Sequence, residues 1–118
     1  MAQYSISEAA RQTSLSCHTL RYYESAGLMP GVSKDASGRR IYTDFDLKTL
    51  KFIKVLRETG MSIKQIAEYG ELYLKGKKTV RQRKDLLESH RQKILGRIKE
   101  HKEYLKIIEA KIAVTSGK

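Results

Sequence analysis

Three side chains that can hydrogen-bond nucleic acid recur at helical spacing near the start of the chain: His18, Arg21 and Tyr22. A guanidinium is suited to phosphate and guanine, while imidazole and phenol groups can hydrogen-bond phosphates or base edges. On a helical wheel these three share one face, and Leu20 and Tyr23 lie on the other. The pattern predicts a recognition helix that buries one face and offers the other to a polar partner.

Two short helices are expected to position that surface. Ser5 and Glu8 match a capping box that opens a first helix ending near Gln12, and its small apolar face permits close packing. Residues 13–16 are too few for anything but a tight reversal, after which Ser16 caps the second helix. The sequence therefore predicts a helix-turn-helix.

The residues after Gly27, a plausible position for ending a helix, indicate a small β-hairpin. Leu28–Val32 and Arg39–Tyr42 are short extended runs on either side of the polar turn 34–38. A two-stranded hairpin is marginal alone, so Ile41 and Tyr42 are expected to pack partly inward while Arg39 or Arg40 reaches out. We interpret this hairpin as a wing whose turn meets a phosphate backbone.

Two further helices complete the predicted head. Thr43 caps a core helix that ends at Gly60, and Ser62 with Gln65 begins the next. The expected apolar surface of the core helix comprises Phe45, Leu47, Leu50, Phe52, Ile53, Val55 and Leu56. The expected apolar residues of the next helix are Ile63, Ile66, Ala67, Tyr73 and Leu74.

A long helix is predicted from the capping-box pair Thr79 and Gln82 to about Ala113. Heptads place Lys84, Arg91, Ile98, Leu105 and Ile112 at a, and Val80, Leu87, Ile94, His101 and Ile108 at d. This seam has no partner within the chain, so we expect a second copy to cover it, through Leu87, Ile94, Ile98, His101, Leu105, Ile108 and Ile112. The predicted organisation is a DNA-binding head at 1–76, a dimerisation helix at 77–113 and a flexible tail at 114–118.

Composition favours a nucleic-acid partner. The 118 residues carry a formal charge of +11 with a pI near 9.8. Residues 1–76 hold 11 Lys and Arg against 8 Asp and Glu, whereas residues 77–118 hold 13 against 5. The densest cluster, Lys77, Lys78, Arg81, Arg83 and Lys84, is either a solvated collar or a long-range attractor of phosphates. Bulk charge alone would therefore direct attention to the long helix.

Other function classes lack support in the sequence. A single cysteine, Cys17, excludes an internal disulfide, and neither a CxxC pair nor an HExxH motif indicates a metal site. There is no catalytic signature, so we expect no enzyme and no cofactor. The chain shows no signal-like segment or long apolar run, and we expect a cytoplasmic protein that does not contact membranes.

The order of elements, with the motifs LRYYExxGL and GxRxY at residues 20–28 and 38–42, closely resembles the MerR family of bacterial transcription regulators. The resemblance covers residues 4–112. It implies a winged helix-turn-helix homodimer joined by an antiparallel coiled coil, which bends and untwists promoters with overlong spacing so that RNA polymerase engages both elements. An architectural or recombination-accessory DNA-bending protein, and an interaction coiled coil with a vestigial head, are the alternatives.

The resemblance also assigns residues. Arg21, Tyr22 and Arg40, the arginine of GxRxY, match positions that contact DNA in the family, and His18 and Thr19 lie where members make base or phosphate contacts. The candidate set is completed by Arg39 and Tyr42 of the wing and by Lys64, a weaker candidate for a phosphate contact. Many relatives carry glycine where this chain has Ser14, and a positive φ there would cost serine about 1 kcal/mol. Thiol-based aldehyde sensors of the short branch carry a cysteine where this chain has Val55, so that sensing chemistry is absent at this position.

Three side chains keep a second interpretation open. Cys17 borders the recognition face, so its oxidation could disturb DNA binding, although a small packed residue without redox duty is the commoner case. His101 in the seam could fix the register or make the dimer sensitive to pH. His90 lies three turns earlier on nearly the same side, which leaves a remote metal alternative. The sequence identifies no inducer.

Overall fold

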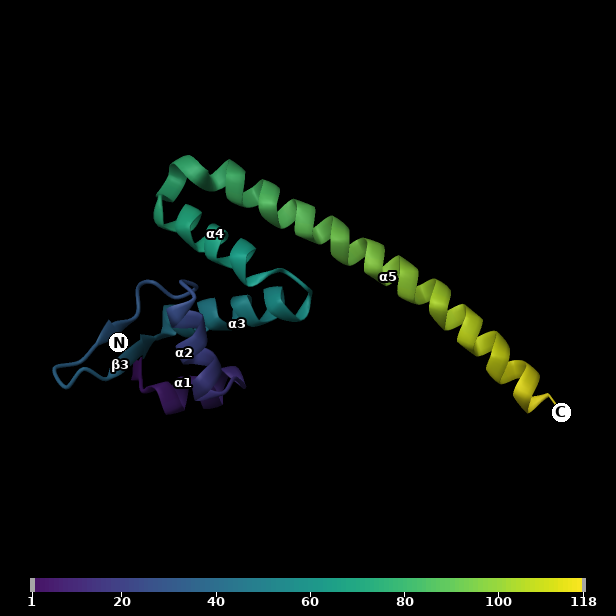
Figure 1. The fold of residues 1–118 in the computed structure, drawn as a ribbon, viewed down its shortest axis with the longest axis horizontal. Coiled ribbons are helices and arrows are strands. Elements are labelled where there is room, and N and C mark those ends of the chain that lie inside the picture. The colour runs from purple at the N-terminus through teal and green to yellow at the C-terminus, as the bar shows by residue number, and fades with distance from the viewer. Residues whose placement is uncertain (1, 118) are drawn as a thin grey trace. The chain divides into compact units, whose positions relative to one another are not determined.

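The computed structural model describes residues 2–117 and confirms the mainly helical fold expected from the sequence. The chain divides into two compact units, residues 1–80 and 81–118. The elements of the first unit are β1 (Gln3–Tyr4), α1 (Ile6–Thr13), α2 (Cys17–Ser25), β2 (Ser33–Lys34), β3 (Arg40–Thr43), α3 (Asp44–Glu58), α4 (Ile63–Leu74) and the 3₁₀ helix η1 (Gly76–Thr79), which leads into α5 (Val80–Ser116) (Figure 1).

The helix-turn-helix forms as predicted. Ser5 and Glu8 make the reciprocal capping box of α1, and Ala9 and Ala10 are buried against the rest of the head. The reversal after α1 passes through Ser14, whose φ of 58° lies in the left-handed region. Its neighbour Leu15 donates its N–H to Ala10 O at 3.0 Å. A left-handed residue at this position closes α1 and lets α2 begin after only three connecting residues.

The wing differs from the predicted hairpin in the length of its first strand and in the presence of a third strand. The first strand of the hairpin is only Ser33–Lys34, and Leu28 and Met29, each 4% exposed, belong to the core rather than to a strand. A further strand, Gln3–Tyr4, pairs antiparallel with β3 and makes a three-stranded sheet in the order β1-β3-β2. The Tyr4 hydroxyl donates to Asp44 Oδ1 at 2.8 Å, which ties the start of the chain to α3. Two residues are too few to show strand periodicity in a sequence.

The core of the head lies along α3. Thr43 and Asp46 form a second reciprocal capping box, and Leu47, Leu50, Ile53 and Leu56 are buried on one face of the helix. At about 100° per residue, these four residues cover about one half of the helix surface. Ser62 caps α4 as predicted, by accepting the N–H of Gln65 at 3.1 Å.

The predicted apolar surface of α3 is too broad. Phe45 and Val55 are 58% and 56% exposed, and Phe52 is 39% exposed, because these positions fall outside the stripe that faces the core. The two phenylalanines instead contact tyrosines of α4, with ring centroids 6.2 Å apart for Phe45 and Tyr73 and 5.9 Å apart for Phe52 and Tyr69. These rings help to line a cavity of about 300 Å³ within the head.

The second unit consists of α5, a helix of 37 residues without interruption (Figure 1). It begins one residue after Thr79 and ends at Ser116, three residues beyond the predicted end. Thr79 closes η1 and directly precedes α5, and its hydroxyl donates to Leu72 O and Gly76 O at 2.5 and 2.9 Å. Within residues 2–117 we find no helix with the length and apolar character needed to cross a membrane.

Candidate nucleic-acid interface

The outer face of α2 is the centre of the candidate interface. Ser16 has extended backbone angles and its hydroxyl accepts the N–H of Thr19 at 3.0 Å, so the helix starts where the sequence predicted. Leu20 and Tyr23 are 1% and 6% exposed and anchor the inner face. Burial of its ring raises the pKa of Tyr23, since the phenolate would lose its hydration. The helix is therefore fixed along one side and has its other side available.

The predicted recognition residues lie on the available side. His18 and Arg21 are exposed, and Tyr22 is 50% exposed although it is a large aromatic residue. The Arg21 guanidinium forms no ion pair with any residue between 2 and 117, so its donors are open to an incoming group. Thr19 is half-buried, with its hydroxyl 2.8 Å from that of Ser16, and contributes to the start of the helix as well as to its surface.

The wing presents Arg39 on a turn of defined geometry. Asp35 Oδ1 accepts the N–H groups of Ser37 and Arg39, both at 2.9 Å, and the Asp35 N–H donates to Arg39 O at 2.8 Å. Gly38 has a φ of +81°, which the tight turn requires and which a side chain would make unfavourable. The Arg39 side chain is exposed, while its backbone is held on both sides.

The other two wing candidates are not fully available. The Nε of Arg40 donates to Glu24 Oε2 near the end of α2, and the side chains are 32% and 22% exposed. Tyr42 is 1% exposed, so the placement of its side chain at a DNA surface was wrong: β3 directs the ring into the core. Its hydroxyl is buried and has no hydrogen-bond partner among the described residues. Burial, and secondly the charge of Glu24, raise the pKa of Tyr42.

Two other predicted residues lie at helix starts. Lys64 is exposed in the first turn of α4, a position from which an ammonium group can reach a phosphate. Cys17 is the first residue of α2 and is half-buried, with its Sγ 3.9 Å from Ile6 O. That placement is typical of a small residue packed between two helices.

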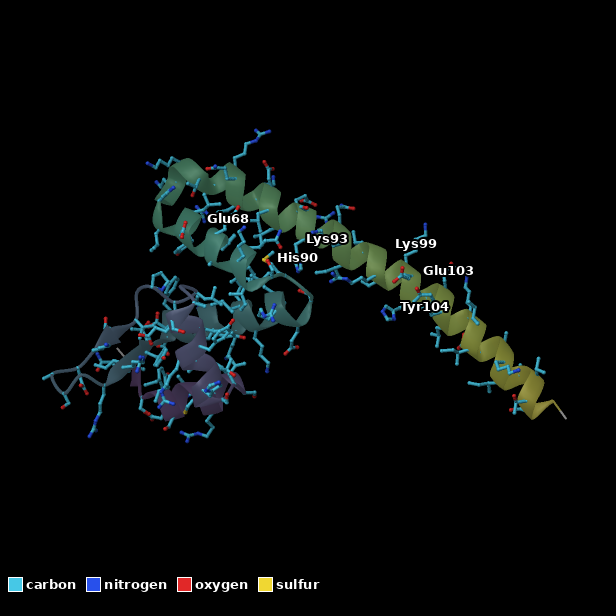
Figure 2. All side chains as sticks on the ribbon, in the orientation of Figure 1. Glu68, His90, Lys93, Lys99, Glu103 and Tyr104 are labelled. Atoms are coloured by element: carbon cyan, nitrogen blue, oxygen red, sulfur yellow. The ribbon has the colours of Figure 1, made fainter. Side chains whose placement is uncertain are left out.

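The predicted seam of α5 is open in the chain described here. Every described residue from 95 to 117 is exposed, including apolar side chains such as Leu105 and Ile112 at 53% and 57%. The seam residues of the first half, Leu87 and Ile94, are half-buried. In Figure 2, Lys99, Glu103 and Tyr104 project from the second half of α5.

The two histidines of α5 differ in their surroundings. His101 is exposed and its ring lies 5.8 Å, edge to face, from that of Tyr104. Burial, followed by the positive charges of Arg97 and Lys93, lowers the pKa of His90. Eleven residues of helix separate the two histidines by about 16 Å along the axis, which is too far for one metal ion. In the described part of the chain, no group of three or more His, Cys, Asp or Glu residues could hold a metal.

Glu24 makes a contact at this surface that the sequence analysis did not predict. It belongs to the LRYYE segment and pairs with Arg40, 16 residues later, across the gap between α2 and the wing. No periodicity relates the two positions, because the contact is made by tertiary packing of a helix against a strand. The only sequence signal was the presence of both residues in the two motifs.

The chain is similar in sequence to known regulators along most of its length. Residues 4–71 match the family described as MerR HTH family regulatory protein, and residues 47–111 match the family described as MerR, DNA binding. An uncharacterized HTH-type transcriptional regulator of Haemophilus influenzae is 37% identical over 93% of this chain and 82% of its own length. The HTH-type transcriptional regulator AdhR of Bacillus subtilis is 42% identical over 76% of this chain and 64% of its own length.

The fold is similar to that of a solved relative in a DNA complex. HiNmlR, described as a MerR family regulator lacking the sensor domain and bound to promoter DNA, superposes with a TM-score of 0.90 at 37% identity. The match covers 95% of this chain and 89% of the HiNmlR chain. These relatives are transcription regulators and not enzymes. With two family matches, a helix-turn-helix and wing in the expected order, and relatives that span most of its length, the chain belongs to the MerR family of transcription regulators.

Proposed function

We propose that this regulator acts as a homodimer that binds a pseudo-palindromic duplex operator between promoter elements. It bends and untwists that DNA and so controls how RNA polymerase engages the promoter. The DNA contacts come from His18, Thr19, Arg21, Tyr22, Arg39 and Lys64. The observation that carries the proposal is the outer face of α2, where Arg21 and Tyr22 are exposed on a helix anchored by Leu20 and Tyr23.

Duplex DNA fits this surface better than other acidic partners. An α-helix fits the major groove, where a guanidinium can bond both guanine acceptors and a phenol can bond a base or a phosphate. The wing offers a second contact, because Arg39 stands on an ordered turn outside the helix. The combination of one base-reading helix and one flanking phosphate contact is typical of winged helix-turn-helix proteins.

The second copy is inferred from α5. A helix of 37 residues is about 55 Å long, and isolated helices with exposed apolar residues gain stability by burying them against a partner. The heptad seam of Leu87, Ile94, Ile98, His101, Leu105, Ile108 and Ile112 supplies an apolar line that is interrupted by polar residues only at Arg91 and His101. A two-fold dimer presents two recognition helices, which makes an inverted repeat the expected operator.

Control of transcription by deformation follows from the same geometry. Two heads on one rigid coiled coil contact two half-sites at a fixed separation, and DNA whose half-sites lie elsewhere must bend or untwist to satisfy both. Bending a site of 20–30 base pairs costs roughly 1–6 kcal/mol, which several phosphate and base contacts can offset. HiNmlR, the similar regulator, is described as bound to promoter DNA.

The test is selection of binding sites from a random duplex library, followed by binding assays on the recovered sequence. We expect an inverted repeat whose half-site centres are separated by one or more helical turns. Arg21→Ala should lower affinity for that repeat by about tenfold or more, since a good base contact contributes about 1–3 kcal/mol of discrimination. Lys106→Gln is the matched control, because it removes one positive charge from an exposed b position of α5, outside both the DNA surface and the dimer seam.

The location of the recovered repeat then separates two roles. A regulator predicts sites between the −35 and −10 elements of a promoter, and transcription in vitro that changes when the protein is added. An architectural or recombination accessory predicts sites at recombination ends and no effect on transcription. Selection that returned no inverted repeat would refute the proposed function.

A further inference from the structure

The contact between α2 and the wing is made by two half-buried charged side chains. Glu24 stands one residue before the end of α2, and Arg40 is the first residue of β3. The Nε of Arg40 donates to Glu24 Oε2, and the side chains are only 32% and 22% exposed. Partly buried pairs are screened less by salt than pairs on the open surface. This contact therefore links the recognition helix to the wing before any DNA is present.

The pair lies beside the buried end of Tyr42. Residues two apart on a strand share a face, so Arg40 and Tyr42 lie on the same side of β3. The charges of Glu24 and Arg40 both act on the Tyr42 hydroxyl, the carboxylate raising its pKa and the guanidinium lowering it. The hydroxyl itself is buried without a partner among the described residues. Arg40 therefore lies at the edge of the core, next to the buried Tyr42 on the same face of β3.

Arg39 has the opposite character. It precedes β3, its side chain is exposed, and it forms no ion pair with residues 2–117. Its backbone N–H and carbonyl are both bonded to Asp35, so the turn that carries the side chain is ordered. A guanidinium on a fixed backbone, without an internal partner, is well suited to a phosphate.

We propose that Arg40 is a positioning residue, which locks the wing to the recognition helix through Glu24, and that Arg39 supplies the phosphate contact of the wing. The inference rests on the proposed function, since it concerns the same DNA surface. It divides two adjacent arginines by role: one holds the wing at a fixed distance from α2, and the other touches DNA. Glu24 becomes necessary for affinity although it is negative and would by charge alone repel DNA.

The first experiment needs no DNA. Glu24→Gln, Arg40→Gln and the double variant are compared with wild type by urea unfolding, which forms a double-mutant cycle. If the Glu24–Arg40 contact stabilises the head, each single substitution lowers the urea midpoint. The midpoint of the double variant is then no lower than that of the less stable single variant. Additive losses would show that the two side chains do not interact, and would overturn the proposal whether or not the protein binds DNA.

The second experiment measures affinity for the selected operator as a function of salt. The double variant replaces an ion pair by two neutral amides, so the net charge is unchanged. We expect it to bind on the order of tenfold more weakly but with the wild-type slope of log K against log salt concentration. Arg39→Gln should reduce the magnitude of that slope by about 0.9, the value for one lost phosphate contact. Lys106→Gln, at an exposed b position of α5, controls for the loss of a charge outside the DNA surface and the dimer seam.

The outcomes are separable from failure of the proposed function. If wild type does not bind the duplex, the proposed function fails, while the unfolding cycle still reports on the lock. If wild type binds and the double variant loses about 0.9 of slope, Arg40 contacts a phosphate and the proposal is wrong. If Glu24→Gln binds as tightly as wild type or more tightly, the carboxylate has no positioning role and the proposal is also wrong.

Discussion

Two adjacent isoleucines of α5 allow a strict test of the proposed dimer. Ile108 is at a d position of the heptad seam and is 57% exposed, while Ile107 is one residue away, outside the seam, and is 69% exposed. Replacing either one by lysine changes the same side chain in the same stretch of helix. Only Ile108→Lys should weaken dimerisation, because only Ile108 faces the partner.

The size of the effect follows from the surface that the partner would cover. Full burial of an isoleucine side chain contributes about 1.5–3 kcal/mol, and somewhat more than half of Ile108 remains to be covered. Each copy therefore loses roughly 1–1.5 kcal/mol, and a two-fold dimer loses about twice as much. The dissociation constant of the dimer should rise about 30- to 150-fold for Ile108→Lys, and less than about threefold for Ile107→Lys.

Sedimentation equilibrium over a range of protein concentrations measures both constants. Far-ultraviolet circular dichroism on the same samples checks that α5 remains helical in each variant. Equal weakening by the two substitutions would refute the heptad assignment, since it would show that the helix end is covered without a preferred face. A wild-type protein that sediments as a monomer throughout would refute the dimer itself.

Four further predictions follow from individual contacts. Ser14→Gly should raise the free energy of unfolding by about 0.5–1 kcal/mol in urea titration, because glycine adopts the left-handed conformation without strain; a lower value would show that the serine side chain compensates. Tyr42→Phe removes a buried, unpartnered hydroxyl and should stabilise the head by about 1 kcal/mol while leaving operator affinity within twofold; weaker binding would return Tyr42 to the interface. Thr43→Ala removes the capping hydroxyl of α3 and should lower the unfolding free energy by about 1 kcal/mol, an effect that Thr115→Ala, near the end of α5, should not reproduce. Burial raises the pKa values of Tyr23 and Tyr42 in the folded protein, so the stability that depends on their neutral forms is fully present below about pH 10 and is lost as the pH rises through the folded values. Urea midpoints should therefore fall between about pH 8 and pH 11, and should fall less steeply in Tyr42→Phe. A midpoint that stays constant over this range would contradict the burial of the two rings.

Elements with a local cause were predictable. The capping pairs Ser5–Glu8 and Thr43–Asp46 begin their helices where serine or threonine precedes an acidic residue by three positions, and Gly27, with a φ of +83°, ends α2. The two faces of α2 followed from helical spacing alone. In each case the signal lies within one or two turns of helix, a range over which backbone hydrogen bonding determines conformation.

Contacts across the head were not predictable in the same way. The strand Gln3–Tyr4 has no pattern of its own and exists because β3 offers it hydrogen-bonding groups. Phe45 and Val55 looked like core residues by hydrophobicity, but the face of α3 that the head covers is the narrower stripe of Leu47, Leu50 and Ile53. Which apolar residues are buried depends on the packing partner, which periodicity does not supply.

By itself, the sequence determined the recognition helix, the order of elements and the family, because capping, helical spacing and two motifs are local properties of the chain. Tertiary structure alone decided how the two wing arginines differ. Arg39 and Arg40 are identical in type and adjacent in sequence, yet the turn leaves Arg39 exposed, while β3 places Arg40 beside Glu24. The same strand buries Tyr42, two residues on. A side chain's partner is set by what the fold brings beside it, and at this surface that partner came from a helix 16 residues earlier.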